Sequence, residues 1–196
     1  MTDLFSRVAL AATLGCLLIS IQPMLAQGSL TPSGPPGPTM LTLSQIEPRT
    51  PVDATHTPGC VFAEFAITNS GSYYLTANIA GVSDLNGIEI QANNVVLDLN
   101  GFSLTNDSTA AGIEVDDDYT NITVRNGCVS GWAIGVFYVG ENGTLENLKV
   151  TGNSQVGIEV GGKTGMVHDC FVSDNRFLGI EIGGNFWGSS TFSVDQ

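Results

Sequence analysis

The stretch GIEVGGKTGMVHDCFVSDNRFLGIEIGG, residues 157–184, carries nearly the same six residues at both ends, GIEVGG at 157 and GIEIGG at 179. Related segments begin at 87 and 112 with Gly-Ile-Glu and at 135 with Gly-Val-Phe, so the repeat steps are 25, 23, 22 and 22 residues. Between them lie short β-branched runs separated by Gly and Asn, and none follows the helical period. A repeat of this length without helices is typical of one coil of a parallel β-helix.

Stacking of such coils about 4.8 Å apart places residues that are one repeat apart directly above each other. Ile158 then stacks on Ile180 and faces the interior, whereas Glu159 points outward. Asn153 over Asn175 predicts a ladder in which side-chain amides bond along the stack. We therefore predict an all-β fold, a right-handed parallel β-helix with coils of about 22 residues.

The composition limits the classes of partner. The chain of 196 residues has 6 Lys and Arg against 19 Asp and Glu, which gives a net charge of −13. So few cations argue against binding to nucleic acid or to an anionic membrane. The excess of acid suits solubility outside the cell or the binding of a cation.

Three segments follow one another along the chain. Residues 1–26 resemble a Sec-type signal peptide, because an uncharged apolar run follows Arg7 and ends near the small residue Ala26. An uncleaved anchor and lipidation at Cys16 remain as alternatives. Residues 27–60 form a Pro-rich extended segment, and 61–196 form the β-helix domain. We expect a secreted, periplasmic or cell-surface protein that has no membrane contact after signal cleavage.

Cysteine usage is sparse and odd. Removal of the signal leaves Cys60, Cys128 and Cys170, which is not a disulfide framework. In the predicted register Cys128 and Cys170 lie about two coils apart, at about 9–10 Å along the axis, which is too far for a disulfide. We expect free thiols.

Several of these segments resemble the secreted bacterial right-handed parallel β-helix proteins of the pectate-lyase-like superfamily. The matching stretches are LTP at 30–32, QIEPRT at 45–50, GSYYLT at 71–76, VLDLNGF at 96–102, VRNG at 124–127 and NFWG at 185–188. The resemblance implies a β-helix fold and association with polysaccharide outside the cytoplasm. The catalytic patterns of polygalacturonases and pectate lyases are absent from the sequence.

The first predicted outward column contains acids and one ring. Its members are Glu89, Glu114, Phe137, Glu159 and Glu181. Two carboxylates about 4.8 Å apart repel by roughly 1 kcal/mol in water, so a cation would be favoured there. With Asp116 and Asp118 the column offers oxygen ligands for Ca²⁺, the one cofactor considered. The alternative is a solvated acidic face.

The second predicted outward column alternates in sign and contains Asp98, Arg125, Glu146 and His168. Such an order predicts a structural ladder of compensating charges. The alternative is catalysis, in which Glu146 and His168 act as an acid and base pair.

Aromatic side chains suggest contact with sugar. Trp132 takes a turn position that holds Asn153 and Asn175 in later repeats, and Phe137 interrupts the acidic column. Together they would form a stacking platform for a saccharide ring, unless Trp132 packs under a loop. The leading hypothesis is a secreted, non-catalytic module for binding or display that is associated with extracellular polysaccharide. A polysaccharide lyase or glycoside hydrolase, whole or as a remnant, and a purely structural surface fragment are the alternatives.

Overall fold

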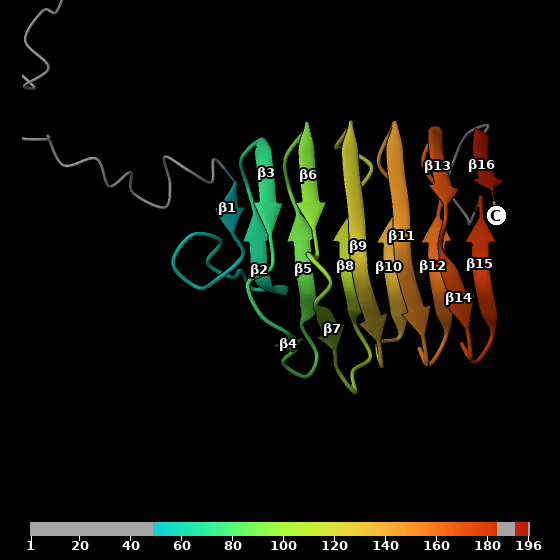
Figure 1. Ribbon diagram of the computed structural model, residues 1–196, viewed down its shortest axis with the longest axis horizontal. Helices are drawn as coiled ribbons and strands as arrows, with labels where there is room; N and C mark the ends of the chain where they lie inside the picture. Colours follow the sequence, from blue (N-terminus) through green and yellow to red (C-terminus); the bar gives the residue numbers. More distant parts are fainter. Residues whose placement is uncertain (1–48, 184–190, 196) are drawn as a thin grey trace, which may run out of the picture. The chain divides into compact units, whose positions relative to one another are not determined.

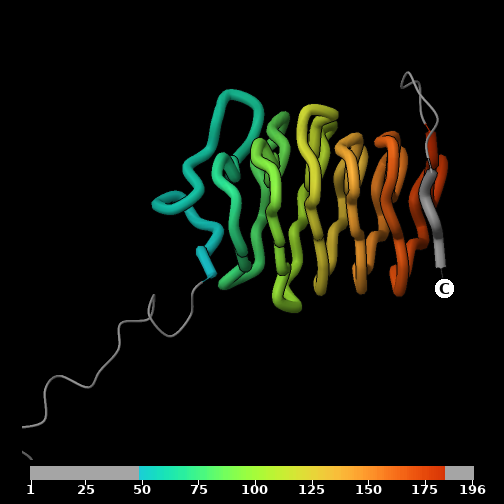
Figure 2. Tube along the Cα trace, turned by 90° about the horizontal axis from the view of Figure 1, so that it is seen from above, coloured from blue at the N-terminus to red at the C-terminus, as the bar shows by residue number. Residues whose placement is uncertain are grey.

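The computed structural model describes residues 49–183 and the backbone of 191–195. The predicted signal peptide, 1–26, and the Pro-rich segment up to residue 48 lie outside the described residues. The described chain contains strands and turns and no helix. All pairings between its strands are parallel, and they stack into a solenoid of about six turns (Figures 1 and 2). The predicted parallel β-helix is confirmed.

A six-stranded sheet forms one side of the solenoid (Figure 1). Its strands in spatial order are β2 (Ala63–Ile67), β5 (Asn86–Ile90), β8 (Ala111–Val115), β10 (Ile134–Tyr138), β12 (Val156–Val160) and β15 (Leu178–Ile182). Each of these strands from β5 onward, except β10, contains the repeated Ile-Glu pair. The recurring sequence segment therefore supplies one strand of the same sheet in each coil from β5 to β15.

A ten-stranded sheet forms the remaining sides. Its main path runs through β1 (Thr50–Pro51), β3 (Gly71–Tyr74), β6 (Val95–Asp98), β9 (Ile122–Ser130), β11 (Gly143–Thr151), β13 (Thr164–His168) and β16 (Thr191–Asp195). Three short strands complete it: β4 (Ile79–Ala80), β7 (Ser103–Thr105) and β14 (Phe171–Ser173). Because β1 pairs with β3, strand pairing already begins in the Pro-rich segment, ahead of the expected domain start at Val61.

The ten-stranded sheet bends in the middle of its two longest strands. The first half of β9 pairs with β6 and its second half with β7, and β11 divides in the same way between β13 and β14. At the bend, Asn126 and Asn147 have φ of 61° and 51°, a region in which Asn is favoured among non-glycine residues. In β9 and in β11 one continuous strand therefore forms both parts of the sheet that meet at the bend.

Inward side chains stack into an apolar core. Ile158 pairs in register with Val136 on one side and Ile180 on the other, and Leu145 pairs with Val124 and Val167. These columns are largely fully buried. One coil has no interior of its own, so the burial that stabilises each coil comes from its neighbours.

A glycine precedes the Ile-Glu or Val-Phe pair in successive coils because the backbones approach closely there. A Cβ at Gly112 would lie 2.6 Å from the carbonyl oxygen of Gly135, and one at Gly135 would lie 2.6 Å from that of Gly157. Real Cβ atoms do not approach backbone so closely. The repeated glycine therefore reflects stacking space rather than unusual torsion angles.

Candidate functional site

The predicted acidic column exists in the predicted register. Glu89 pairs with Glu114, Glu114 with Phe137, Phe137 with Glu159, and Glu159 with Glu181. All five belong to the six-stranded sheet. The expectation of a uniformly solvated face is wrong for Glu89, which is only 7% exposed. Its carboxylate accepts bonds from the Cys60 thiol at 3.3 Å and from the Gln91 amide at 2.7 Å.

Glu114 has the most perturbed acidity in the column. Partial burial, with repulsion from Asp116 and Glu89, raises the pKa of Glu114 to about 7. Burial also raises the pKa of Glu159, with a smaller contribution from Glu181. Among residues 49–183, no Lys, Arg or His forms an ion pair with any carboxylate of this column. Burial and neighbouring negative charge both favour the neutral form of a carboxyl group, which explains why these two pKa values are raised.

The predicted calcium ligands share a column and a nearby turn. Asp116 and Asp118 lie in the turn that follows β8. The charge of Asp116 contributes to the raised pKa of Glu114, and burial together with the charge of Glu89 raises the pKa of Asp116 itself. No group of three or more Asp, Glu, His or Cys side chains in the described coils is arranged to hold a metal ion. Calcium binding by these residues therefore remains a prediction for experiment.

Trp132 is not part of a stacking platform, because its side chain is fully buried in the core. Its backbone N–H donates to Asn153 Oδ1 at 3.1 Å, and its indole N–H donates to the carbonyl oxygen of Leu104 at 3.3 Å. Its ring fills space left by small residues, since a Cβ at Gly81 would lie 2.3 Å from it. The alternative in which this residue packs inside is correct, and the predicted platform loses one of its two rings.

The other predicted ring, Phe137, does line a groove. The groove has a volume of about 280 Å³ and lies on the outer face of β8 and β10. It is lined by Asn86, Thr109, Ala110, Ala111, Glu114, Ala133, Ile134, Phe137 and Gln155. We call it the Glu114 groove, because Glu114 is the only charged residue in its lining.

The alternating column is also confirmed, and its charges are paired. Arg125 contacts Asp98 through Nε at 3.2 Å and Glu146 through Nη1 at 3.6 Å. His168 Nε2 lies 3.3 Å from Glu146 Oε2, and its Nδ1 lies 2.9 Å from Asp169 Oδ2. Arg49 adds a second cation on Asp98 at 3.5 Å. This arrangement is a ladder of opposite charges across successive coils.

The contact between Glu146 and His168 is the only geometry among the described residues that matches a predicted catalytic pair. Both groups are partly exposed, yet each has a second partner, Arg125 of the ladder for Glu146 and the adjacent Asp169 for His168. A general base needs a free face toward the proton that it removes. The ladder thus accounts for the pair without catalysis.

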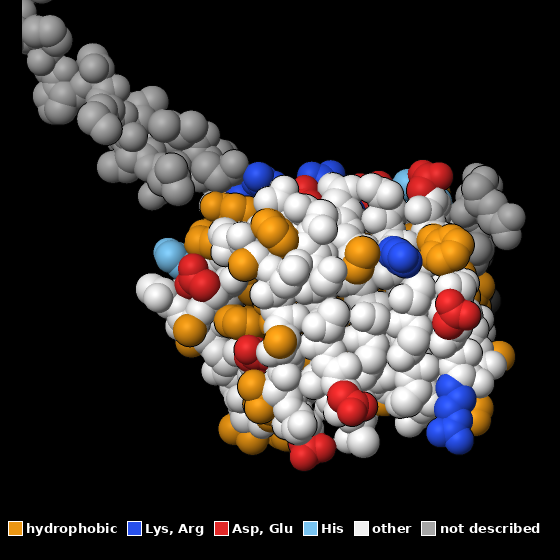
Figure 3. All heavy atoms as spheres, turned by 60° about the horizontal axis from the view of Figure 1, so that its bottom comes forward, with side chains coloured by type: hydrophobic (Ala, Val, Ile, Leu, Met, Phe, Trp, Pro, Cys, Tyr) orange, Lys and Arg blue, Asp and Glu red, His pale blue; other side chains and the backbone are white. Residues whose placement is uncertain are grey.

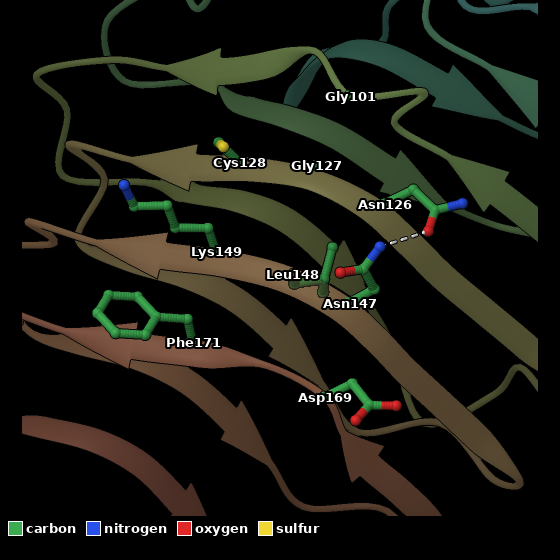
Figure 4. A pocket seen from close by; sticks show the side chains of 9 residues that line it. All are labelled: Gly101, Asn126, Gly127, Cys128, Asn147, Leu148, Lys149, Asp169 and Phe171. Atoms are coloured by element: carbon green, nitrogen blue, oxygen red, sulfur yellow. Dashed lines mark hydrogen bonds between the residues drawn. The ribbon is translucent and has the colours of Figure 1, made fainter. Parts of the chain in front are cut away.

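A second groove lies along the bend of the ten-stranded sheet (Figure 4). Its volume is about 360 Å³, and it is lined by Gly101, Asn126, Gly127, Cys128, Asn147, Leu148, Lys149, Asp169 and Phe171. We call it the Lys149 groove. Along one side Cys128, Lys149 and Phe171 stand in register on β9, β11 and β14. Along the other side Asn147 Nδ2 donates to Asn126 Oδ1 at 2.9 Å.

The Lys149 groove combines an exposed ring with an exposed cation. Phe171 is 61% exposed. Lys149 makes no hydrogen bond or ion pair to any residue that the structure describes, whereas Arg49, Arg125 and Lys163 each pair with a carboxylate. Figure 3 shows acidic and basic side chains close together along the upper edge of this face and scattered singly over the rest of it. The sequence signal for this site was the Asn or Asp that ends each middle strand, but it does not reveal which side chains flank the bend.

The three cysteines of the described region, Cys60, Cys128 and Cys170, are free, as expected. Cys128 lines the Lys149 groove. Cys170 packs against the core, where burial raises the pKa of its thiol. A neutral thiol in such a place behaves as a small apolar side chain.

Comparison with known proteins gives no relative: the sequence matches no family profile, no curated protein and no solved structure at a significant level. Within the part of the chain that the structure describes, no helix is long and apolar enough to cross a lipid bilayer. The class that the structure itself defines is a parallel β-solenoid.

Proposed function

We propose that this protein is a non-catalytic β-helix module that binds a polysaccharide outside the cytoplasm. The observation that carries the proposal is the Lys149 groove, where an exposed ring, a cation that has no partner among the described residues and the hydrogen-bonded amides of Asn126 and Asn147 line one shallow site. Phe171 offers an apolar face on which a sugar ring can stack. Export is supported by the signal-like sequence at 1–26.

The polar lining of the groove suits the hydroxyl groups of a sugar. Asn147 still has an oxygen acceptor after donating to Asn126, and Asp169 and Lys149 supply a strong acceptor and a strong donor. Successive coils repeat these positions about 4.8 Å apart. An extended chain that runs along the solenoid axis would therefore meet the polar groups of Asn126, Asn147 and Asp169 in consecutive coils.

The proposal is tested by isothermal titration with a panel of neutral and acidic oligosaccharides. At least one should bind, and Phe171→Ala should weaken its binding by about tenfold, which is the size expected for loss of one stacked ring and its burial. Lys149→Gln should weaken an acidic glycan more than a neutral one. The matched control is Phe177→Ala, which removes a ring of 67% exposure outside the groove and should change nothing. Equal loss in both phenylalanine variants would contradict the assignment, and no binding at all would favour a purely structural role.

A second candidate function, polysaccharide lyase or glycoside hydrolase, is favoured only by the 3.3 Å contact between Glu146 and His168. The same panel decides it when incubated mixtures are examined for new unsaturated ends and new reducing ends. We expect neither. Product that disappears in both Glu146→Gln and His168→Ala would replace the binding hypothesis with catalysis.

A further inference from the structure

We propose that the Glu114 groove is a second, separate binding site, and that it takes a sugar residue with a free primary amino group. Glu114 would pair with the ammonium group, Phe137 would stack against the apolar face of the ring, and Gln155 would bond to a hydroxyl group. The proposal concerns the six-stranded sheet and does not rest on binding at the Lys149 groove.

The charge of the site points to a cation. Glu114 stacks directly on Glu89, and Asp116 adds a third nearby negative charge. The described coils provide no Lys, Arg or His partner for Glu114. A carboxyl group with a pKa of about 7 readily gives up its proton when a cation approaches, since the opposite charge favours the ionised form.

The groove holds the Glu114 carboxylate in a defined position. Asn86 Oδ1 accepts the N–H of Ala111 at 3.0 Å, which turns the Asn86 amide nitrogen toward Glu114. That nitrogen donates to Glu114 Oε2. The other carboxylate oxygen makes no hydrogen bond among the described residues, so it is free to accept one from a ligand. An ammonium group would form a charge-assisted bond there.

The other lining residues favour a sugar over a simple amine. Phe137 is the next residue in the column after Glu114 and is partly exposed in the groove. Gln155 is exposed, and its side chain makes no hydrogen bond to any residue the structure describes. A volume of about 280 Å³ lies just below the range of roughly 300–1,000 Å³ found for ligand pockets, which suits a single ring. A ring, a carboxylate and a free amide together match an amino sugar.

The test is isothermal titration at pH 7 and physiological salt with a short oligomer of glucosamine and with its N-acetylated counterpart. Wild-type protein should bind the free amine and bind the neutral counterpart at least about tenfold more weakly, because acetylation removes the charge. Glu114→Gln and Phe137→Ala should each weaken binding of the amine by about tenfold. Glu114→Gln relieves repulsion, so the fold should be retained.

The matched control is Glu159→Gln. It removes the same charge from the same column, outside the groove, and should leave affinity within about twofold. Equal weakening by Glu159→Gln and Glu114→Gln would overturn the proposal in favour of general attraction to an acidic protein. Equal affinity of a short lysine peptide, lost in Glu114→Gln, would assign the groove to a protein partner and also overturn it. Phe171→Ala should not affect this binding, which separates the result from the fate of the Lys149 groove.

Discussion

On the ten-stranded sheet, Asp98, Arg125 and Glu146 stack with alternating charge and form ion pairs at 3.2 and 3.6 Å. On the six-stranded sheet, Glu89 stacks directly on Glu114. No Lys, Arg or His among the described residues forms an ion pair with either carboxylate. Both columns arise from the same coil repeat, so neither the spacing nor the register separates them. They differ only in which side chains occupy the outward positions.

This difference shows that the coil register does not depend on charge compensation. The apolar interior and the backbone ladders hold the coils in place, and the outward side chains adapt to whatever neighbours result. The compensated column adapts by pairing, whereas the acidic column adapts by burial of Glu89 and by the raised pKa of Glu114. A cation from outside the protein would therefore interact more favourably with the acidic column than with the compensated one, because the carboxylates of the acidic column have no ion-pair partner among the described residues.

The largest effect should come from breaking the stacking on which both columns depend. Gly135→Ala would place a Cβ 2.5 Å from Val150 Cγ1 and 2.6 Å from the carbonyl oxygen of Gly157, and should lower the free energy of unfolding by about 3 kcal/mol. Gly152→Ala is the control, because it has open space around it and only a positive φ of 68°. It should cost about 1 kcal/mol. Urea unfolding measures both, and equal losses would contradict the stacking argument.

Breaking the compensated column should have the next largest effect. Arg125→Met removes the cation between Asp98 and Glu146, and the Asp98 side chain is only 9% exposed. We expect a loss of about 2 kcal/mol in the free energy of unfolding, reduced below a fully buried pair because Arg125 is partly exposed. Lys163→Met breaks an exposed pair with Glu141 and should be indistinguishable from wild type. No loss in Arg125→Met would mean that the ladder does not stabilise the fold.

The acidic column should make stability fall as pH rises. The folded-state pKa of Glu114 is raised to about 7, so between about pH 4.5 and 7 the folded state holds a proton that the unfolded state has lost. The contribution of protonated Glu114 to the free energy of unfolding is therefore fully present below about pH 4.5 and is lost as the pH rises above about 7. The change should be about 1–2 kcal/mol after allowance for solvent screening. Urea unfolding of wild type and Glu114→Gln at pH 5 and pH 8 measures it, and an identical pH slope in both would refute this assignment.

The smallest effect concerns calcium. We expect that the double variant Glu159→Gln with Glu181→Gln changes the melting temperature little, or raises it slightly by removing repulsion between stacked acids. Millimolar Ca²⁺ should shift neither protein relative to chelator, since a ligand raises the melting temperature only if it binds the folded state. A clear shift in wild type that the double variant lacks would establish the acidic column as a cation site.

The sequence by itself determined the β-helix and the order of both columns. The repeat length sets which residues stack, so Glu89 over Glu114 and Glu146 over His168 follow from counting. The Asn153 ladder on Asn175 follows in the same way, and its amide bond is present at 2.8 Å. Alternation along a strand then assigns the direction of each side chain, because successive residues point to opposite faces.

Only the tertiary structure decided the direction of side chains at turns and bends, where the inward and outward alternation along a strand stops. Trp132 and Asn153 occupy the same turn position, yet the indole enters the core because Gly81 and other small residues leave room for it. The sheet bends at Asn126 and Asn147, and this bend brings Lys149 and Phe171 beside the hydrogen-bonded amides of these two residues. The repeat length predicts which residues stack on each other along the solenoid axis. The shape of the coil in cross-section depends instead on packing between residues that occupy different positions of the repeat.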